Sequence, residues 1–482
     1  MRQTTIVAVL DAPPRAAGVA AAASSADWLE VVSTSGAVDA GWLRARFDGL
    51  LLYTLRDRGP ARTACLLRAA ESFDLVDLTA EDLTPELLAA IPPERRVLSA
   101  HAETGDGLRA AAAAILTHPA RLYRLTAHAA DSGDELAAPE LLRELGRDDV
   151  TAFATGPVGL WTRVLAPWLG ARFVFGGAEE DDVPSGRPSV TRLIDSFGFP
   201  ALPEVQELFG MVGQPVLHSL SPRIHNTAYR AFHHPALYLP FHVASFERFW
   251  SRVVQSGAID RLGFPLRGLS VVSPHKTAAI AAAHRSSASV QHALSTNVFL
   301  RDDGDGWSAE TTDVHGILFT LREHAVQFRH QRVAVIGCGG SGRAMASALH
   351  EAGADVTLVN RGPERGALAR NLLHLPYVPL SAFACEGYGI VVNATPVGRD
   401  DEELPFPVSR LRRDATVVDL VYRDTPTPLI ARTRGPGRIT VDGWDMLMAQ
   451  ARHQFELMTG MEMPGELIRQ TLGFAPAEAI AE

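Results

Sequence analysis

"RVAVIGCGGSGRAMASALHEAGADVTLVNR", residues 332–361, is the stretch of this chain that says most about its fold. An apolar strand leads into Gly337-x-Gly339-x-x-Gly342, and an amphipathic helix and a second apolar strand follow. Glycines at this spacing permit a tight turn, and they let backbone N–H groups at the start of the helix reach a pyrophosphate. The order strand, glycine loop, helix and strand therefore predicts a Rossmann unit that binds a dinucleotide.

The end of the second strand distinguishes between the two nicotinamide dinucleotides. An acidic residue there binds the ribose 2′-hydroxyl of NAD, whereas an arginine accommodates the 2′-phosphate of NADP. This strand ends in Asn360-Arg361, and Arg365 follows closely. NADP is therefore the expected cofactor, and Glu364 keeps NAD open as the alternative.

The composition excludes several classes of protein. The net charge of −10 argues against a general nucleic-acid binder. No apolar run approaches the roughly 18 residues of a membrane span. Cys65, Cys338 and Cys385 are widely separated, which fits a reducing cytoplasm and gives neither a disulfide framework nor a zinc site. We expect a cytoplasmic globular protein with no metal.

The first half of the chain alternates short apolar runs with alanine-rich helical runs. Repeated βα units over roughly 200 residues favour a (β/α) barrel over an open sheet. The strand candidates are 5–10, 48–55, 73–78, 95–101, 121–127, 150–155 and 171–177.

Lys276, in "SVVSPHK" (270–276), is the only lysine of the chain, and every other basic residue among the 45 Lys plus Arg is arginine. Arginine supplies charge as well as lysine does, but it cannot give up its proton in a protein. One position that keeps lysine therefore indicates a task that needs a compact ammonium or a mobile proton.

Eight sequence blocks resemble those of shikimate dehydrogenase and occur in that family's order. The barrel-like half stands where a type I 3-dehydroquinate dehydratase precedes shikimate dehydrogenase in bifunctional enzymes such as those of plants. The resemblance implies an α/β chain with a barrel at 1–200, a substrate-binding domain at 207–312 completed by 446–475, and a Rossmann domain at 313–445. The blocks are 213–226, 270–276, 295–313, 337–344, 360–365, 391–398, 417–430 and 442–460.

The resemblance also implies roles for individual residues. Lys276 matches the catalytic lysine and Asp313 its partner. The substrate-binding positions match Ser219 and Ser221 for a carboxylate, Asn297 for ring hydroxyls, and Tyr422 and Gln450. The cofactor-binding positions match Gly337, Gly339, Gly340, Ser341, Gly342, Asn360, Arg361, Arg365, Thr395, Leu420 and Gly443.

Some of these residues have a second interpretation. Asp313 could serve as the N-cap of the helix that begins "VHGILF", and Ser219 and Ser221 could cap the helix that contains Pro222. The histidines show no set of metal-ligand partners.

The reaction implied is hydride transfer between NADP and a ring carbon that bears a hydroxyl or a ketone. Lys276 would supply or receive the accompanying proton, with Asp313 holding it in place. A small cyclic hydroxy acid is therefore the expected partner. A non-catalytic regulator that binds a ring acid is the alternative from another class.

The substrate half departs from the family at three positions. Val272 replaces a threonine that helps to hold a substrate hydroxyl, which removes a hydrogen bond worth about 1 kcal/mol. Val298 stands where threonine is usual, and Thr311 where asparagine is usual. Shikimate stays the leading substrate, with quinate or an amino or deoxy relative as alternatives.

The barrel half departs more severely. Arg124 stands where the dehydratases have their imine-forming lysine, and arginine cannot form a Schiff base under these conditions. Val32 and Arg187 also replace expected residues. We therefore expect no dehydratase activity, and a role as scaffold, dimerisation element or small-molecule sensor. Positions that match the family are Glu30, Arg56, His101 and Arg163.

Overall fold

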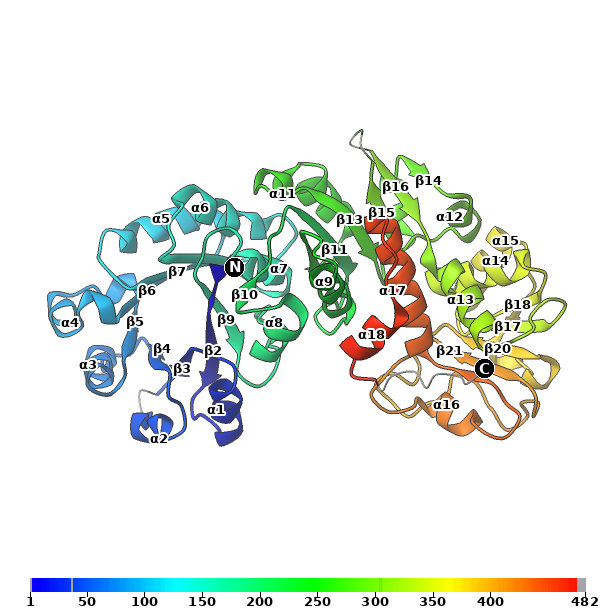
Figure 1. Cartoon of the computed structure of the whole chain (residues 1–482), viewed down its shortest axis with the longest axis horizontal. Helices are drawn as coiled ribbons and strands as arrows, with labels where there is room; N and C mark the ends of the chain where they lie inside the picture. The colour runs from blue at the N-terminus through cyan, green and yellow to red at the C-terminus, as the bar shows by residue number, and fades with distance from the viewer. Residues whose placement is uncertain (1, 36–37, 303, 305, 475–482) are drawn as a thin grey trace. The chain divides into compact units, whose positions relative to one another are not determined.

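The computed structural model describes residues 2–35, 38–302, 304 and 306–474, and the chain divides into two units, Met1–Leu266 and Arg267–Glu482. The first unit runs from blue to green in Figure 1, and the second from green to red. The domain limits expected from the sequence stay a prediction, and their ends at residues 1 and 475 lie outside the described residues.

The first unit contains a sheet of eight parallel strands in the order β8-β7-β6-β5-β4-β3-β2-β9, which we call the barrel-like sheet. One side-chain hydrogen bond also links the two end strands, β8 and β9: the Thr151 hydroxyl donates to the Phe173 carbonyl at 3.3 Å. The strands are β2 Thr5–Asp11, β3 Trp28–Ser33, β4 Leu50–Leu55, β5 Leu75–Leu78, β6 Arg96–Ala102, β7 Leu122–His128, β8 Val150–Thr155 and β9 Phe173–Gly177.

A helix follows each strand of this sheet, as the alternation in the sequence predicts, and Figure 1 shows these helices around the outside of the strands. Strand β3 was missing from the predicted strands, because it carries Glu30 in its centre and is nevertheless buried along its whole length. The helices are α1 Ala16–Ala23, α2 Ala40–Arg44, α3 Arg62–Ser72, α4 Pro85–Ala90, α5 Gly105–Leu116, α6 Ala137–Leu145, α7 Leu160–Leu165 and α8 Val190–Phe197.

The inner face of the barrel-like sheet has an apolar layer and a polar layer. Side chains two residues apart on a strand share a face. Trp28, Leu52 and Leu122 belong to one apolar cluster, and each is followed two residues later by a polar residue. The polar layer consists of Glu30, Thr54, Asp77, Ser99 and Arg124.

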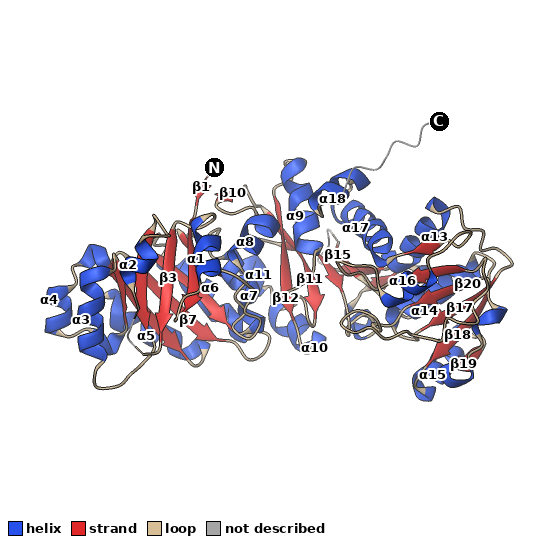
Figure 2. Cartoon of the chain, turned by 90° about the horizontal axis from the view of Figure 1, so that it is seen from below, coloured by secondary structure: helices blue, strands red, loops and turns tan. Residues whose placement is uncertain are grey.

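The rest of the first unit is a short βαβ segment, in which β11 Glu207–Gly213 pairs in parallel with β12 Ala236–His242 and α9 Ser221–Ala231 connects them. Strand β1, Arg2–Gln3, pairs with β10, Ala201–Leu202. Figure 2 shows these strands in red and the helices in blue. Three short helical segments complete the unit: α10 Phe246–Phe249, η5 Trp250–Val254 and α11 Ala258–Arg261.

The second unit begins with small antiparallel pairings. Strand β15 pairs with β13 on one side and with β16 on the other, and β16 pairs in parallel with β14. The elements are β13 Leu266–Val271, β14 Arg285–Ser286, α12 Ala288–Ala293, β15 Val298–Arg301 and β16 Trp307–Glu310.

A six-stranded parallel sheet with the order β19-β18-β17-β20-β21-β22 forms the rest of this unit. This is the 3-2-1-4-5-6 order of dinucleotide-binding folds, so the predicted Rossmann domain is confirmed. The elements are α13 Thr312–Glu323, β17 Arg332–Ile336, α14 Gly340–Glu351, β18 Asp355–Asn360, α15 Pro363–Leu373, β19 Tyr377–Pro379, β20 Ile390–Asn393, β21 Thr416–Asp419, α16 Pro428–Thr433, β22 Thr440–Val441, α17 Gly443–Thr459 and α18 Gly465–Thr471.

Both faces of this sheet are covered. Val333 and Val335 face a cluster that includes Met345 and Met446, whereas Ala334 and Ile336 face the other side. Alternate residues of β17 are therefore buried on opposite faces, as in a doubly wound sheet. Among the described residues, no helix has the length and apolarity that a bilayer span requires, and no group of side chains could hold a metal ion.

Candidate active site

Lys276 and Asp313 form a close ion pair in the second unit. Lys276 follows β13, and Asp313 lies in the first turn of α13. The Lys276 Nζ donates to Asp313 Oδ2 at 2.6 Å, and the side chains are 15% and 1% exposed respectively. A carboxylate buried this deeply depends on its cation and its hydrogen bonds. The structure thus brings together the two residues to which the resemblance gives the proton chemistry.

Two amides complete the surroundings of Asp313. The Gln450 Nε2 donates to Asp313 Oδ1 at 2.8 Å, and the Asn297 Nδ2 donates to the same oxygen at 3.4 Å. The Asn297 Oδ1 in turn accepts the Thr312 N–H at 2.7 Å. Asn297 and Gln450 therefore lie at the ion pair, where they fix the orientation of the carboxylate.

A further buried chain of hydrogen bonds escaped the sequence-based prediction. The Gln454 Nε2 donates to the Thr312 hydroxyl at 3.3 Å, and its Oε1 accepts from the Ser270 hydroxyl at 2.9 Å. Gln454 stands four residues after Gln450 on α17, and residues at this spacing share one face of a helix. That spacing was the signal from which the role of Gln454 could have been predicted.

The lysine is also bound to the glycine loop. The Lys276 Nζ donates to the Ser341 hydroxyl at 2.8 Å. A Cβ on Gly340 would lie 3.0 Å from the Lys276 Cβ and 2.7 Å from the Ser295 Oγ, so the loop contacts the lysine segment closely. An ammonium has three protons. Two are directed to Asp313 and Ser341, and the third has no partner within the described part of the chain.

Arg343 fixes this contact and was not predicted. Its buried guanidinium donates to the Thr277 hydroxyl at 2.7 Å, to the Leu294 carbonyl at 2.8 Å and to the Cys338 carbonyl at 3.3 Å. The residue beside Lys276 is thereby joined to the glycine loop. Thr277 and Leu294 lie far from Arg343 in the sequence, so no local pattern could reveal this role.

The glycine loop has the shape that a dinucleotide pyrophosphate needs. Gly337 has a φ of 105°, and a Cβ on Gly342 would lie 1.8 Å from the Gly337 carbonyl oxygen, so both positions require glycine. No atom comes within 4 Å of a Cβ on Gly339, at the N-cap of α14. The N–H groups of the 12-residue helix α14 therefore begin beside open space, which suits an anion.

The end of β18 positions the residues that would face the adenosine ribose. The Asn360 Oδ1 accepts the Cys338 N–H at 3.1 Å, and its Nδ2 donates to the Gly362 carbonyl at 2.8 Å. Arg361 follows the strand, Arg365 lies near the start of α15, and both are exposed. These two guanidiniums could bind a 2′-phosphate.

The remaining cofactor positions that the resemblance implies include Thr395 and Leu420, which follow β20 and β21. Thr395 N–H and hydroxyl both donate to Asn393 Oδ1, at 3.1 and 2.7 Å. The Asn393 Nδ2 donates to Asp419 Oδ1 at 2.9 Å, and the Leu420 N–H donates to the Asn393 carbonyl at 3.0 Å. Asn393 and Asp419, which were not predicted, thus hold Thr395 and Leu420 at the carboxyl ends of β20 and β21.

Gly443 and Tyr422 lie beyond these strands. A Cβ on Gly443 would lie 2.5 Å from the Val421 carbonyl, so the helix α17 can start there only with glycine. Tyr422 packs against Trp444 with ring centroids 4.9 Å apart, and burial raises the pKa of its phenol.

Comparison with known proteins agrees with this geometry. The model of the shikimate dehydrogenase substrate binding domain matches residues 211–299, and that of the shikimate 5'-dehydrogenase C-terminal domain matches residues 443–472. A third model, ketopantoate reductase PanE/ApbA, matches residues 333–379. Shikimate dehydrogenase (NADP(+)) of Acidiphilium cryptum is 38% identical over 258 residues, which are 53% of this chain and 91% of that protein. The chain belongs to the shikimate dehydrogenase family.

Two further similarities describe its relation to that family. A chloroplastic bifunctional 3-dehydroquinate dehydratase/shikimate dehydrogenase of Arabidopsis thaliana is 29% identical over 337 residues, which are 66% of this chain and 55% of that protein. The crystal structure of shikimate dehydrogenase from Aquifex aeolicus is 26% identical, has a TM-score of 0.51, and covers 56% of this chain and 98% of that chain.

The family's serine pair lies in the first unit, where Ser219 precedes α9 and Ser221 is its first residue. The Ser219 Oγ accepts the Ser221 N–H at 3.2 Å, and neither hydroxyl caps the helix in the N-cap position, which Leu220 occupies. The alternative role of Asp313 is also corrected. The N-cap of α13 is Thr311, because the helix begins at Thr312, before the stretch "VHGILF".

His324 gives the second unit a pH-dependent contact between α13 and α17. Its Nε2 lies 3.4 Å from Asp445 Oδ2, and this hydrogen bond raises the pKa of His324 to about 8 from 6.5. A raised pKa adds stability that is fully present below pH 6.5 and is lost as the pH rises through about 8. We expect the unfolding temperature of the second unit to fall over this range, and to fall less in His324→Gln. Equal pH dependence in both proteins would contradict this prediction.

Proposed function

We propose that this protein is an NADP-dependent oxidoreductase that interconverts 3-dehydroshikimate and shikimate or a closely related cyclic hydroxy acid. The observation that carries the proposal is the ammonium of Lys276, which is held by Asp313 and Ser341 beside the glycine loop with one proton left for a ligand. Family membership supports the same reaction, because the 38% identical relative is a shikimate dehydrogenase (NADP(+)).

The residues fit the chemistry of ketone reduction. Bound NADPH would supply the hydride to the ring carbon. Lys276 gives a proton to the oxygen as the ketone becomes an alcohol, and takes it back in the reverse direction. Asp313 keeps the ammonium in place, and Gln450 keeps Asp313 oriented. Hydride and proton together account for the two hydrogens that the ketone gains.

Substrate contacts follow from the family's residues. Within the second unit we assign the ring hydroxyls to Asn297 and a pocket-lining role to Tyr422. The assignment of the substrate carboxylate to Ser219 and Ser221 stays a prediction from the resemblance. Val272 lacks the hydroxyl with which the family usually contacts the substrate. The ring substituent that lies beside Val272 is therefore the one expected to distinguish shikimate from the alternative substrates.

A substrate panel tests this assignment. The full chain would be incubated with NADP+ and with shikimate, quinate or an amino analogue, and NADPH formation would be followed. We expect the highest kcat/KM with shikimate. The variant Val272→Thr should be slow with any analogue that lacks a hydroxyl at the ring position beside residue 272. Turnover of quinate alone would replace shikimate by quinate, and turnover of none would leave the ring-acid-binding regulator as the better account.

The barrel-like sheet is proposed to be a degenerate type I dehydratase barrel. The Arabidopsis alignment covers 66% of the chain, which is a larger share than residues 207–482 alone make up. The alignment therefore extends into the barrel half, and this supports the proposal. Arg124 occupies the position of the imine-forming lysine, and it is bound by Glu30 at 2.7 Å and by Asp77 at 2.6 Å. A guanidinium in such a cluster cannot attack a carbonyl.

We therefore expect no dehydration of 3-dehydroquinate by the full chain. The assay follows the absorbance of the enone product, with His101→Ala as the matched variant. Product that appears with the wild type and disappears with His101→Ala would contradict the prediction.

A cytoplasmic location completes the proposal, and a homodimer stays a prediction. The location is supported by Cys65, Cys338 and Cys385, which are all buried free thiols.

A further inference from the structure

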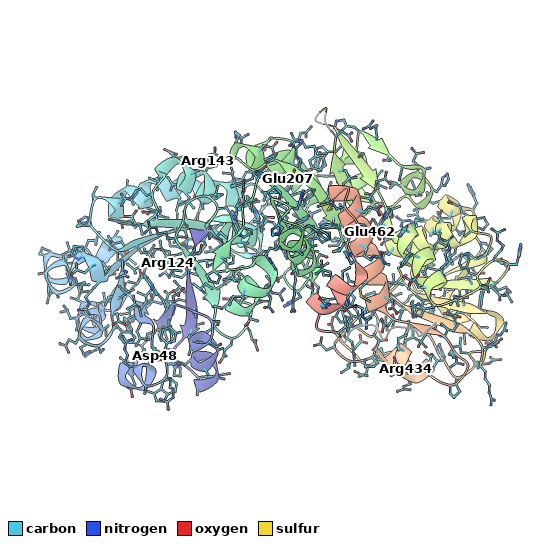
Figure 3. The ribbon with its side chains drawn as sticks, viewed as in Figure 1. Asp48, Arg124, Arg143, Glu207, Arg434 and Glu462 are labelled. Atoms are coloured by element: carbon cyan, nitrogen blue, oxygen red, sulfur yellow. The ribbon has the colours of Figure 1, made fainter. Side chains whose placement is uncertain are left out.

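A cavity of about 390 Å³ lies at the carboxyl ends of the barrel-like strands. Its floor is the polar layer, in which the Arg124 guanidinium contacts Glu30 and Asp77 and also donates from Nε to the Ser99 hydroxyl at 3.0 Å. Figure 3 labels Arg124 on β7. The charged groups of this floor are therefore bound to one another. Two other arginines, Arg163 and Arg187, line the wall of the cavity.

Arg163 is a buried cation that forms no ion pair within the part of the chain that the structure describes. It lies on α7, is 5% exposed, and places its guanidinium 3.9 Å from the centre of the Phe153 ring. Its Nε is buried without a hydrogen-bond partner among the described residues. Buried guanidiniums are normally paired, because an unpaired buried charge is costly. The side chain lines the cavity, so the missing partner could enter there.

Arg187 adds a second cation to the same wall. One of its Nη atoms lies 3.3 Å from Asp182 Oδ2, whereas its Nε is also buried without a partner in the described part of the chain. Burial, followed by the nearby charges of Arg187 and Arg124, lowers the pKa of Arg163 to about 9. Asp182 and Glu30 act in the opposite direction, but Arg163 itself forms no ion pair within the described residues.

The loop that carries Arg187 is held in place by the backbone. The Gly156 N–H donates to the Ser185 carbonyl at 3.0 Å, and the Gly177 N–H donates to the Pro188 carbonyl at 2.9 Å. A Cβ on Gly186 would lie 2.1 Å from the Gly156 carbonyl oxygen, and this glycine has a φ of 65°. The loop therefore keeps Arg187 in the wall of the cavity that Arg163 also lines, before any ligand arrives.

We propose that this cavity binds a small metabolite through a phosphate group held by Arg163 and Arg187. A phosphate with several oxygens can accept hydrogen bonds from both guanidiniums at once, whereas one carboxylate suits a single forked guanidinium. The volume of the cavity suits a small molecule. The site does not depend on the dehydrogenase reaction.

Isothermal titration of the full chain tests the proposal. The protein is first saturated with NADP+, so that the phosphate positions near Arg361 are occupied, and is then titrated with inorganic phosphate, ribose 5-phosphate or succinate. We expect both phosphates to bind, and Arg163→Gln and Arg187→Gln to weaken binding about ten- to hundredfold. The control Arg172→Gln changes an arginine that is 63% exposed, and should leave binding unchanged.

The thermal stability of the ligand-free chain separates a binding role from a structural one. Removal of an unpaired buried charge should raise the unfolding temperature, so Arg163→Met is expected to be more stable than the wild type without phosphate. Phosphate should then stabilise the wild type and Arg172→Gln but not Arg163→Met. The proposal is overturned if the folded wild type binds neither phosphate, if succinate binds more tightly than both, or if Arg163→Met is less stable without ligand.

Discussion

Lys276→Arg should lower kcat for NADPH-dependent ketone reduction by about 10²–10⁴-fold, while the affinity for NADPH stays unchanged. Arginine keeps the positive charge, so it can still pair with Asp313, which lies 2.6 Å from the lysine. It cannot release a proton at neutral pH, and the ketone oxygen then has no proton donor. The loss should therefore appear in turnover and not in cofactor binding.

Steady-state NADPH oxidation and fluorescence titration with NADPH measure the two quantities separately. Arg285→Lys is the control for the exchange of the two basic residues, because Arg285 is 72% exposed and pairs with Asp302 at the surface. It should keep its activity. Wild-type turnover in Lys276→Arg would show that the ammonium does not donate the proton.

Arg124→Met should destabilise the first unit by about 3–5 kcal/mol. The substitution leaves the carboxylates of Glu30 and Asp77 buried without their cation, although Thr54 and Ser99 still donate hydrogen bonds to them. Arg124→Lys should be less destabilising, because it keeps the charge and loses only the forked geometry. The cluster therefore depends on charge first and on shape second.

Urea denaturation followed by tryptophan fluorescence measures this effect, because five of the seven tryptophans lie in the first unit. The control is Arg172→Met, for which a change within about 0.5 kcal/mol is expected at an exposed site. A loss below about 1 kcal/mol in Arg124→Met, the range of an exposed ion pair, would contradict the account of a buried charge cluster.

The sequence predicted the elements whose patterns are local. The Rossmann sheet follows from apolar strands and glycines at fixed spacing, and seven of the eight barrel-like strands follow from apolar runs. Strand β3 was missed because Glu30 looks like a surface residue until its partner Arg124, 94 positions away, is known. A buried charge can be recognised only together with the residue that pairs with it.

The candidate site shows the same limit. Lys276 stood out because its residue type occurs once, and the structure brings Asp313, Asn297 and Gln450 to it. Arg343 stood inside a quoted motif and was still overlooked, because its acceptors Thr277, Ala293 and Leu294 lie 49 to 66 residues away. Arg163 was named only as a family match, since the lack of a partner for its Nε is a property of packing.

The most direct test is NADPH oxidation by the full chain in the presence of 3-dehydroshikimate. We expect oxidation that requires the ring acid, that forms shikimate, and that is lost in Lys276→Arg. A folded chain that binds NADPH and leaves it unoxidised with 3-dehydroshikimate and with the related ring ketones would contradict the proposed dehydrogenase function.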